Sequence, residues 1–146
     1  MNYWYWVLAF VGDGAQQNYK ITRRTNAFYV SSNRTPVGRA RPGDRALFYL
    51  AGQGFVAEAK ISWPARKPYG EIEWSSKKPP LWGISVSDIR PFPSPILYKF
   101  PGKGAHEALG FHCYSLPGGF LAIPRAGFED VLGWADAGCA NVAEDT

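Results

Sequence analysis

The sequence has few of the residues that bind metals or form disulfides: its 146 residues include two cysteines and two histidines. Cys113, Cys139, His106 and His112 lack the paired close spacings of zinc motifs, so we expect neither a metal site nor a cofactor. A chain of this length buries about 68–70% of its unfolded surface, so the two cysteines favour buried thiols over a disulfide. We expect one domain over residues 1–137, with residues 138–146 as a frayed tail.

Long apolar runs are also absent. The longest, such as residues 46–51, end far short of the roughly 20 residues that a membrane span needs. The first six residues contain neither a basic region nor the small-residue cleavage site of a signal peptide. The sequence therefore predicts a cytoplasmic protein with no membrane partner.

The common catalytic motifs are missing too. His106 and Glu107 are followed by His112 at the wrong spacing for a metalloprotease helix. Cys113 follows His112 directly, and neighbours in a strand point to opposite faces, so the two would not form a nucleophile and base. Neither a Gly-x-Ser-x-Gly elbow nor a P-loop occurs. The sequence thus favours a protein that is not an enzyme.

Aromatic residues and basic charge, by contrast, are abundant. Phe, Trp and Tyr make up 16% of the chain, with six Trp among them. Residues 1–103 hold 15 Lys and Arg against 6 Asp and Glu, whereas residues 104–146 hold 1 against 6. Because basic side chains neutralise phosphates and flat rings stack on bases, this combination favours a nucleic-acid surface in the first two thirds. The alternative is a mixed, solvated surface that keeps the protein soluble.

Apolar runs bounded by turn residues predict an order that is mostly strand after strand. Strands are expected at residues 2–11, 26–30, 45–51, 55–63, 82–90 and 111–116, the fourth ending at Pro64. Residues 15–25 favour a short helix or loop, residues 64–80 an ordered excursion or mobile flap, and Pro124 opens a helix to about Trp134. We therefore expect an α+β fold: a small, bent β-barrel of five to seven strands flanked by short helices.

The composition of a base pocket occurs at the end of the second expected strand. Phe28 and Tyr29 precede a polar loop that begins with Ser31 and Ser32, so a ring and several hydrogen-bonding groups meet there. A flipped base is bound by stacking between rings and by hydrogen bonds to its edge. The alternative is that Phe28 is simply a core residue.

Several segments occur in an order shared with a known family. Residues 2–4 open an apolar strand, residues 26–30 precede the polar loop, Arg41-Pro42-Gly43-Asp44-Arg45 leads into another apolar strand, and residues 55–60 follow. Lys67-Pro68-Tyr69, the strand at Trp82 and the final helix around Phe128 come next. In these segments the chain resembles the EVE domains of the PUA-like superfamily, relatives of the YTH readers of methylated adenine. The likeness covers roughly residues 2–134.

The resemblance implies a PUA-like pseudo-barrel that binds nucleic acid and holds one base, often modified, in an aromatic-lined pocket. Methylated or hydroxymethylated cytosine and N6-methyladenine are the bases expected. Trp63 is an alternative to Trp82 for the opposite wall, and Ala9 adjoins the pocket. The pocket residues that the resemblance implies are Phe10, Phe28, Tyr29, Val30, Ser31, Ser32 and Trp82.

One departure from the family has a physical consequence. Relatives often carry a polar residue, frequently Asn, near the end of the first strand, whereas this chain has Ala9-Phe10-Val11. A missing bidentate contact removes roughly 1–3 kcal/mol of discrimination. We therefore expect a reader that selects its base by shape and stacking.

Seven basic residues are expected to contact the nucleic-acid backbone: Arg23, Arg24, Arg34, Arg39, Arg41, Lys77 and Lys78. The family's link to defence against modified DNA favours DNA over RNA and implies a separately encoded nuclease as a partner. An RNA-binding module is one alternative. Another is a domain that binds a small ligand or hydrolyses a nucleoside, with Asp13, Asp44 or Glu58 as the catalytic base. A third is a structural domain whose acidic segment 104–146 docks another chain.

Overall fold

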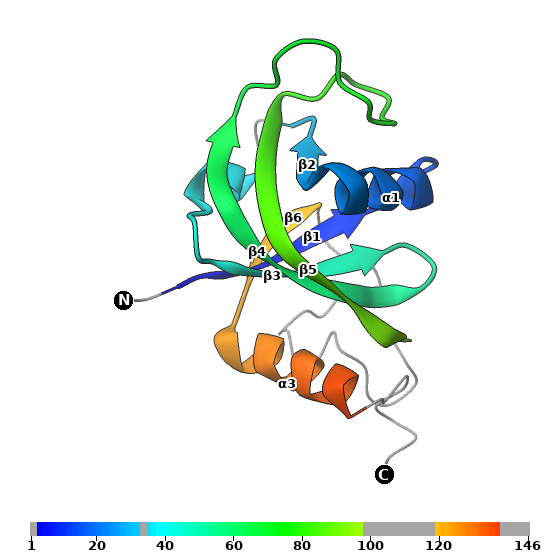
Figure 1. Cartoon of the computed structure of the whole chain (residues 1–146), viewed down its shortest axis with the longest axis vertical. Coiled ribbons are helices and arrows are strands. Elements are labelled where there is room, and N and C mark those ends of the chain that lie inside the picture. Colours follow the sequence, from blue (N-terminus) through cyan, green and yellow to red (C-terminus); the bar gives the residue numbers. More distant parts are fainter. Residues whose placement is uncertain (1–2, 33–34, 98–118, 138–146) are drawn as a thin grey trace.

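The computed structural model describes residues 3–32, 35–97 and 119–137 (Figure 1). Six strands and two α-helices lie in this part of the chain, which agrees with the expected barrel of five to seven strands. The elements are β1 (Tyr5–Phe10), α1 (Ala15–Thr25), β2 (Ala27–Val30), the 3-10 helix η1 (Pro36–Arg39), β3 (Arg45–Leu50), β4 (Gly54–Arg66), β5 (Trp82–Ile96), β6 (Phe120–Ile123) and α3 (Arg125–Asp136). Neither α-helix of the described part is long and apolar enough to cross a membrane.

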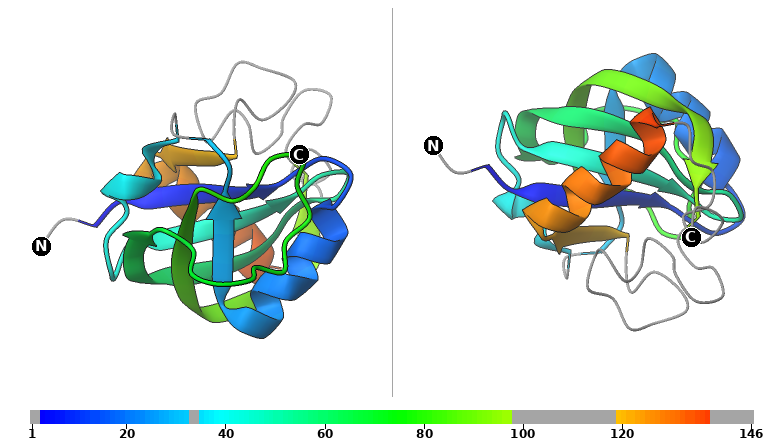
Figure 2. Two further views of the ribbon diagram at one scale, coloured as in Figure 1. Left: turned by 90° about the horizontal axis from the view of Figure 1, so that it is seen from above. Right: turned by 90° about the horizontal axis from the view of Figure 1, so that it is seen from below.

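One mixed sheet forms the body of the molecule, with its strands in the order β2-β5-β4-β3-β1-β6. β1 runs parallel to β3, from Tyr5 opposite Arg45 to Phe10 opposite Leu50, and the other pairings are antiparallel. The sheet curls so far that rings from its two outermost strands, Phe28 and Phe120, lie 6.5 Å apart between centroids. The curled sheet is thus an open barrel (Figure 2).

Two hydrophobic cores lie on opposite faces of this sheet. Trp6, Leu8 and Phe10 of β1 point into the barrel interior, whereas Val7 and Ala9 point toward α3. Because both faces of β1 are covered, almost every residue of the strand is apolar. This arrangement explains why the first expected strand shows no alternation of polar and apolar residues.

A buried carboxylate fixes the turn that enters β3. Asp44 is 2% exposed and accepts hydrogen bonds from the backbone N–H of Trp4 (3.0 Å) and of Arg41 (2.9 Å) and from Trp6 Nε1 (2.9 Å). Its own backbone carbonyl accepts from the N–H of Ile61 at 2.8 Å. The Pro-Gly-Asp turn therefore ties together the starts of β1 and β3 and the middle of β4.

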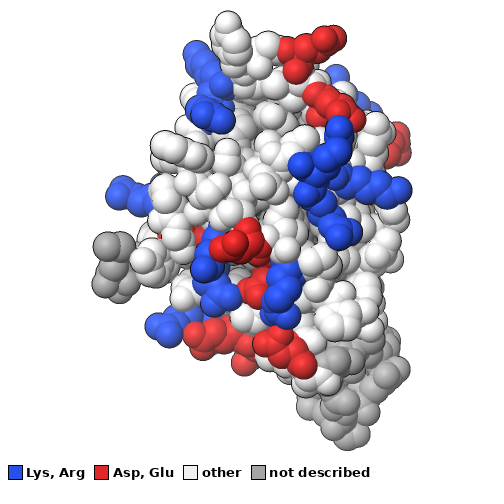
Figure 3. Space-filling model, viewed as in Figure 1, with Lys and Arg blue, Asp and Glu red and all other residues white. Residues whose placement is uncertain are grey.

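A cluster of charged side chains attaches α3 to the sheet. Glu58 of β4 bonds Arg45 Nη2 and Arg90 Nε, both at 2.6 Å, and Arg90 also reaches Asp136 of α3 at 2.9 Å. The Arg45 guanidinium also lies over the Phe128 ring of α3, 4.9 Å from its centroid. Figure 3 shows the alternating basic and acidic side chains where β4, β5 and α3 meet.

Two sequence-based expectations differ from the structure, and several others lie outside the described residues. Pro64 does not end the fourth strand, since β4 continues to Arg66. Beyond Lys60 the register with β3 ends, so a proline here removes no hydrogen bond to that strand. The short apolar strand β6 was not among the strands expected from the sequence. The expected strand at 111–116, the tail at 138–146, Arg34, and the cysteines and histidines lie outside the described residues.

Candidate functional site

A cavity of about 720 Å³ lies where β1 and β2 end, beneath the long loop of residues 67–81 that joins β4 to β5. Figure 1 and the left view of Figure 2 show this loop, in green, passing over the end of β2. Of the expected pocket residues, the structure places six on this cavity: Phe10, Phe28, Tyr29, Val30, Ser31 and Ser32. Ala9 and Asp13 line it as well.

Three rings form the apolar part of the cavity. Phe10 and Phe28 are each 2% exposed, and their centroids lie 5.2 Å apart with the rings nearly perpendicular. Trp74, from the loop, lies 5.7 Å from Phe28 and 6.3 Å from Phe10. Phe28 is therefore both a core residue and part of the cavity, so the two interpretations of it are compatible.

The 67–81 loop contributes the ring of Trp74 to the cavity, whereas Trp82, which was expected to form the opposite wall, is not one of the described residues that line it. Trp82 lies in β5 opposite Val30 of β2. Trp63, the alternative, is 62% exposed on β4 and does not line it either. Trp74 was missed because no local pattern marks it: its position depends on contacts with residues more than 40 positions away in the sequence.

The loop is held against α1 by a two-point amide contact. Asn18 Nδ2 donates to the Ser75 carbonyl at 2.7 Å, and the Ser75 N–H donates to Asn18 Oδ1 at 2.8 Å. A side chain at Gly14 would collide with Ser75, so the loop also needs glycine at the start of α1. Arg24 of α1 pairs with Glu73 at 2.6 Å, next to Trp74. Trp74 is thus fixed from both sides along the chain.

Among the described residues, no strand pairs with the edge of β2 that faces away from β5, and this free edge can supply polar groups to the cavity. The carbonyls of Asn26 and Val30 accept hydrogen bonds from the N–H groups of Val86 in β5 and of Leu81, the residue before β5. Backbone groups alternate in direction along a strand, so Tyr29 and Ser31, which both line the cavity, present theirs to the opposite edge. One N–H and one C=O from each residue can therefore meet the edge of a bound ring.

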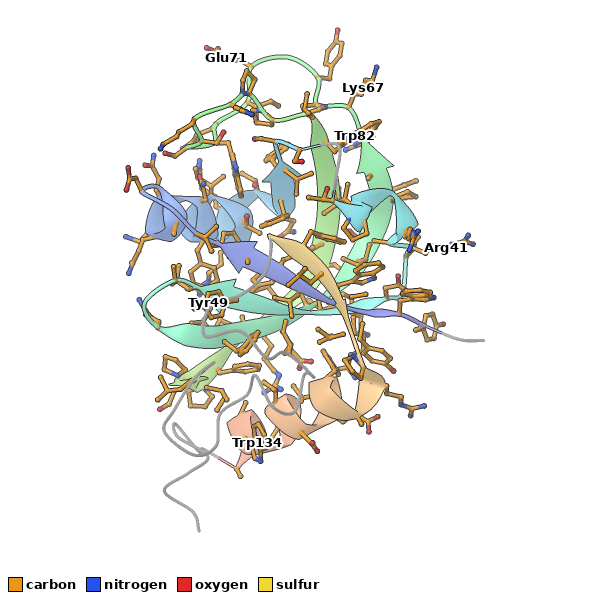
Figure 4. All side chains as sticks on the ribbon, turned by 180° about the vertical axis from the view of Figure 1, so that it is seen from behind. Arg41, Tyr49, Lys67, Glu71, Trp82 and Trp134 are labelled. Atoms are coloured by element: carbon orange, nitrogen blue, oxygen red, sulfur yellow. The ribbon has the colours of Figure 1, made fainter. Side chains whose placement is uncertain are left out.

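The expected backbone contacts do not form one patch. Lys77 and Lys78 line the cavity and are exposed. Arg23 and Arg24 lie on α1, where Arg23 covers the Tyr19 ring at 5.6 Å. Arg39 and Arg41 lie at η1, which is on the other side of the barrel from α1 (Figure 4).

The carboxylates considered as catalytic bases have different surroundings. Asp44 and Glu58 are engaged in the turn and in the α3 contact described above, and neither lines the cavity. Asp13 is exposed and lines it. Within the described ranges, no group of three His, Cys, Asp or Glu side chains could hold a metal ion.

Solved structures with the same architecture identify the fold. A variant of ZmASCH from Zymomonas mobilis has a TM-score of 0.61 at 10% identity, covering 88% of this chain and 96% of that one. The human THYN1 protein, solved in complex with DNA containing 5-methylcytosine, has a TM-score of 0.52 at 14% identity, covering 91% and 98%. The chain has a PUA-like fold.

The PUA-like fold predicted from the resemblance to EVE domains is thus confirmed. A protein from Leishmania major is similar in the same way, with a TM-score of 0.59 at 12% identity, covering 94% of this PUA-like chain and 97% of its own. No protein-family model matches the sequence, and no curated protein matches it.

Proposed function

We propose that this PUA-like chain is a non-catalytic, EVE-like reader that binds nucleic acid and holds one modified base in the cavity beneath the 67–81 loop. The observation that carries this proposal is the combination of three rings, a free strand edge and two exposed lysines around one cavity. Phosphate contacts position a nucleic acid, and groups inside a pocket select the base.

The cavity suits a base in size and in chemistry. Its volume of about 720 Å³ lies within the range of roughly 300–1,000 Å³ typical of small-molecule sites. Stacking on an aromatic ring contributes about 1–3 kcal/mol per base. β1 ends in Ala9 and Phe10 without an amide side chain, so hydrogen bonds to the base edge fall to the backbone of Tyr29 and Ser31.

A methyl or hydroxymethyl group on the base fits this balance of forces. The added group buries apolar surface against the rings, at about 25 cal/mol per Å². DNA is the favoured partner because the THYN1 structure of the same fold contains 5-methylcytosine DNA. Any cleavage that follows binding would belong to a separate protein, such as a nuclease.

The test is a titration with matched oligonucleotides, plain or carrying 5-methylcytosine, 5-hydroxymethylcytosine or N6-methyladenine. DNA and RNA are compared in single- and double-stranded form at two salt concentrations. We expect at least tenfold preference for one modified base, together with salt-dependent affinity. Retention of RNA alone would identify an RNA-binding module, and absence of any binding would refute the proposal.

Two variants connect the preference to the cavity. Phe28→Leu keeps an apolar side chain in the core but removes the flat ring, and Trp74→Ala removes the ring of the loop. Trp134→Ala is the matched control, because this half-buried Trp of α3 lies at the opposite end of the molecule (Figure 4). Discrimination should fall in the first two variants and persist in the third.

Hydrolysis of a modified nucleoside is the second candidate, supported by the exposed carboxylate of Asp13 on the cavity. General-base catalysis needs a carboxylate within hydrogen-bond reach of the attacking water. Incubation with each nucleoside, followed by analysis of free base and sugar, separates the two functions. Product that disappears in Asp13→Asn would establish the enzyme, whereas intact nucleoside supports the reader.

A further inference from the structure

A second cavity, of about 330 Å³, lies beside the first, and Tyr29 lines both. It is bounded by β2, β5 and the start of the 67–81 loop, and its lining includes Arg66, Lys67 and Tyr69. We propose that this second cavity binds the nucleotide adjacent to the one whose base occupies the first cavity. Arg66 and Lys67 would contact its phosphate, and Tyr69 would stack on its base. This inference rests on the proposed function.

Tyr29 forms the partition between the two cavities. Side chains alternate along β2, so Phe28 points into the barrel interior and Tyr29 points to the outer face. Gly83 lies opposite Tyr29 in β5, and a Cβ on Gly83 would lie 2.7 Å from Tyr29 Cε1. The Tyr29 ring also contacts Trp74, with 5.2 Å between centroids. A strand that enters the first cavity therefore needs to pass only one ring to reach the second.

Two features of the side chains around the second cavity favour a ligand-binding role over a purely structural one. Tyr69 is 98% exposed, so its ring contributes almost nothing to the core. Neither Arg66 nor Lys67 forms an ion pair with any of the described side chains. Figure 3 shows basic side chains where β4 ends, apart from the acidic side chains farther along the loop, and Figure 4 shows Lys67 at the outer end of the molecule.

A cation beside an exposed ring matches the two parts of a nucleotide. A guanidinium binds phosphate oxygens in a planar, bidentate manner, and an ammonium binds them as a point charge. Exposed rings stack on bases of any sequence, because every base has a π-face. The second cavity would thus add affinity for a strand without adding selectivity for the modified base.

The separation of affinity from selectivity gives the test. The plain and modified oligonucleotides of the first titration are titrated with Tyr69→Ala and with the double variant Arg66→Ala/Lys67→Ala. Loss of one stacked base should weaken binding about 5- to 150-fold. The double variant should lower the slope of log affinity against log salt by about 0.7 for each single-strand phosphate that the protein no longer neutralises. The ratio of affinities for modified and plain oligonucleotides should not change.

Matched controls come from elsewhere on the chain. Tyr3→Ala removes a tyrosine that is 48% exposed, precedes β1 and is not among the described residues that line either cavity. Lys60→Ala removes one positive charge, from a lysine that pairs with Asp88 at 3.7 Å, and so gives the effect of a single lost charge elsewhere on the surface. The role of the second cavity alone is refuted if the Tyr69 and double variants bind like these controls, while the wild-type protein binds and Phe28→Leu loses discrimination. If wild-type protein binds no oligonucleotide, both proposals fail.

Discussion

The contact between Asn18 and the loop allows a prediction with a defined magnitude. Asn18→Ala removes two hydrogen bonds, from Nδ2 to the Ser75 carbonyl and from the Ser75 N–H to Oδ1. At about 0.5–1.5 kcal/mol each, these bonds stabilise the closed loop by about 1–3 kcal/mol. The true value should lie toward the lower end, because Ser75 is exposed and water can replace the missing partner.

Hydrogen exchange at the Ser75 amide measures this change directly. When the loop closes much faster than the open amide exchanges, the exchange rate follows the opening equilibrium, so it should rise about 5- to 150-fold in Asn18→Ala. Arg24→Ala is the comparison, since the Arg24–Glu73 pair is about 60% exposed on both sides. Exposed pairs contribute about 0–1 kcal/mol, so this variant should accelerate exchange by less.

Two results would refute the reasoning about the loop. Exchange at Ser75 within twofold of the wild-type rate would mean that the amide contact does not hold the loop. Faster exchange in Arg24→Ala than in Asn18→Ala would mean that the ion pair is the main restraint. If the loop opens more often but nucleic-acid affinity stays the same, Trp74 does not need to be prepositioned for binding.

Three further predictions concern the barrel around the site. Asp44→Ala should lower the free energy of unfolding by about 3–5 kcal/mol, because it leaves three N–H donors without their acceptor; urea denaturation checks this, and a loss below about 1 kcal/mol would contradict it. Gly83→Ala should destabilise by about 1–3 kcal/mol through collision with Tyr29, whereas Gly133→Ala, a helix site with open space, should stabilise slightly. Burial raises the pKa of Tyr19, and nearby Arg23 opposes this with a smaller effect. The native state therefore holds the tyrosine proton more tightly than the unfolded chain does. The free energy of unfolding should then fall as the pH rises above the pKa of tyrosine in the unfolded chain, about 10. Urea midpoints across that range, compared with Tyr19→Phe, measure the effect.

Much of the fold could be predicted because local patterns and tertiary structure agree. α1 occupies residues 15–25, where the sequence favoured a short helix or loop, and β3 follows the Pro-Gly-Asp turn directly. The strand continues through Pro91, Pro93 and Pro95, where its pairing with β2 has already ended at Ser85 and β4 is its paired neighbour among the described strands. β5 can therefore continue through prolines that would interrupt a strand bonded on both sides.

The candidate site was only partly predictable, for a physical reason. Phe28 and the residues after it share one strand end, so their proximity follows from local sequence. Trp74 reaches the cavity because Asn18, 57 positions from Ser75, holds the loop. Proximity to Lys77 and Lys78 in the sequence pointed instead to Trp82, which pairs with Val30 in the sheet. Contacts across such separations leave no periodic signal in the chain.

The anchoring of the 67–81 loop makes it an exchangeable module. Arg66 and Gly83 lie opposite each other in β4 and β5, so the segment starts and ends on one rigid stem. The entropic cost of closing a loop grows only slowly with its length. Transplanting a different segment between these two positions should therefore change which ligand the barrel accepts while the barrel itself still folds. Ligand preference in this molecule would then be able to evolve, or be engineered, in one short stretch of chain.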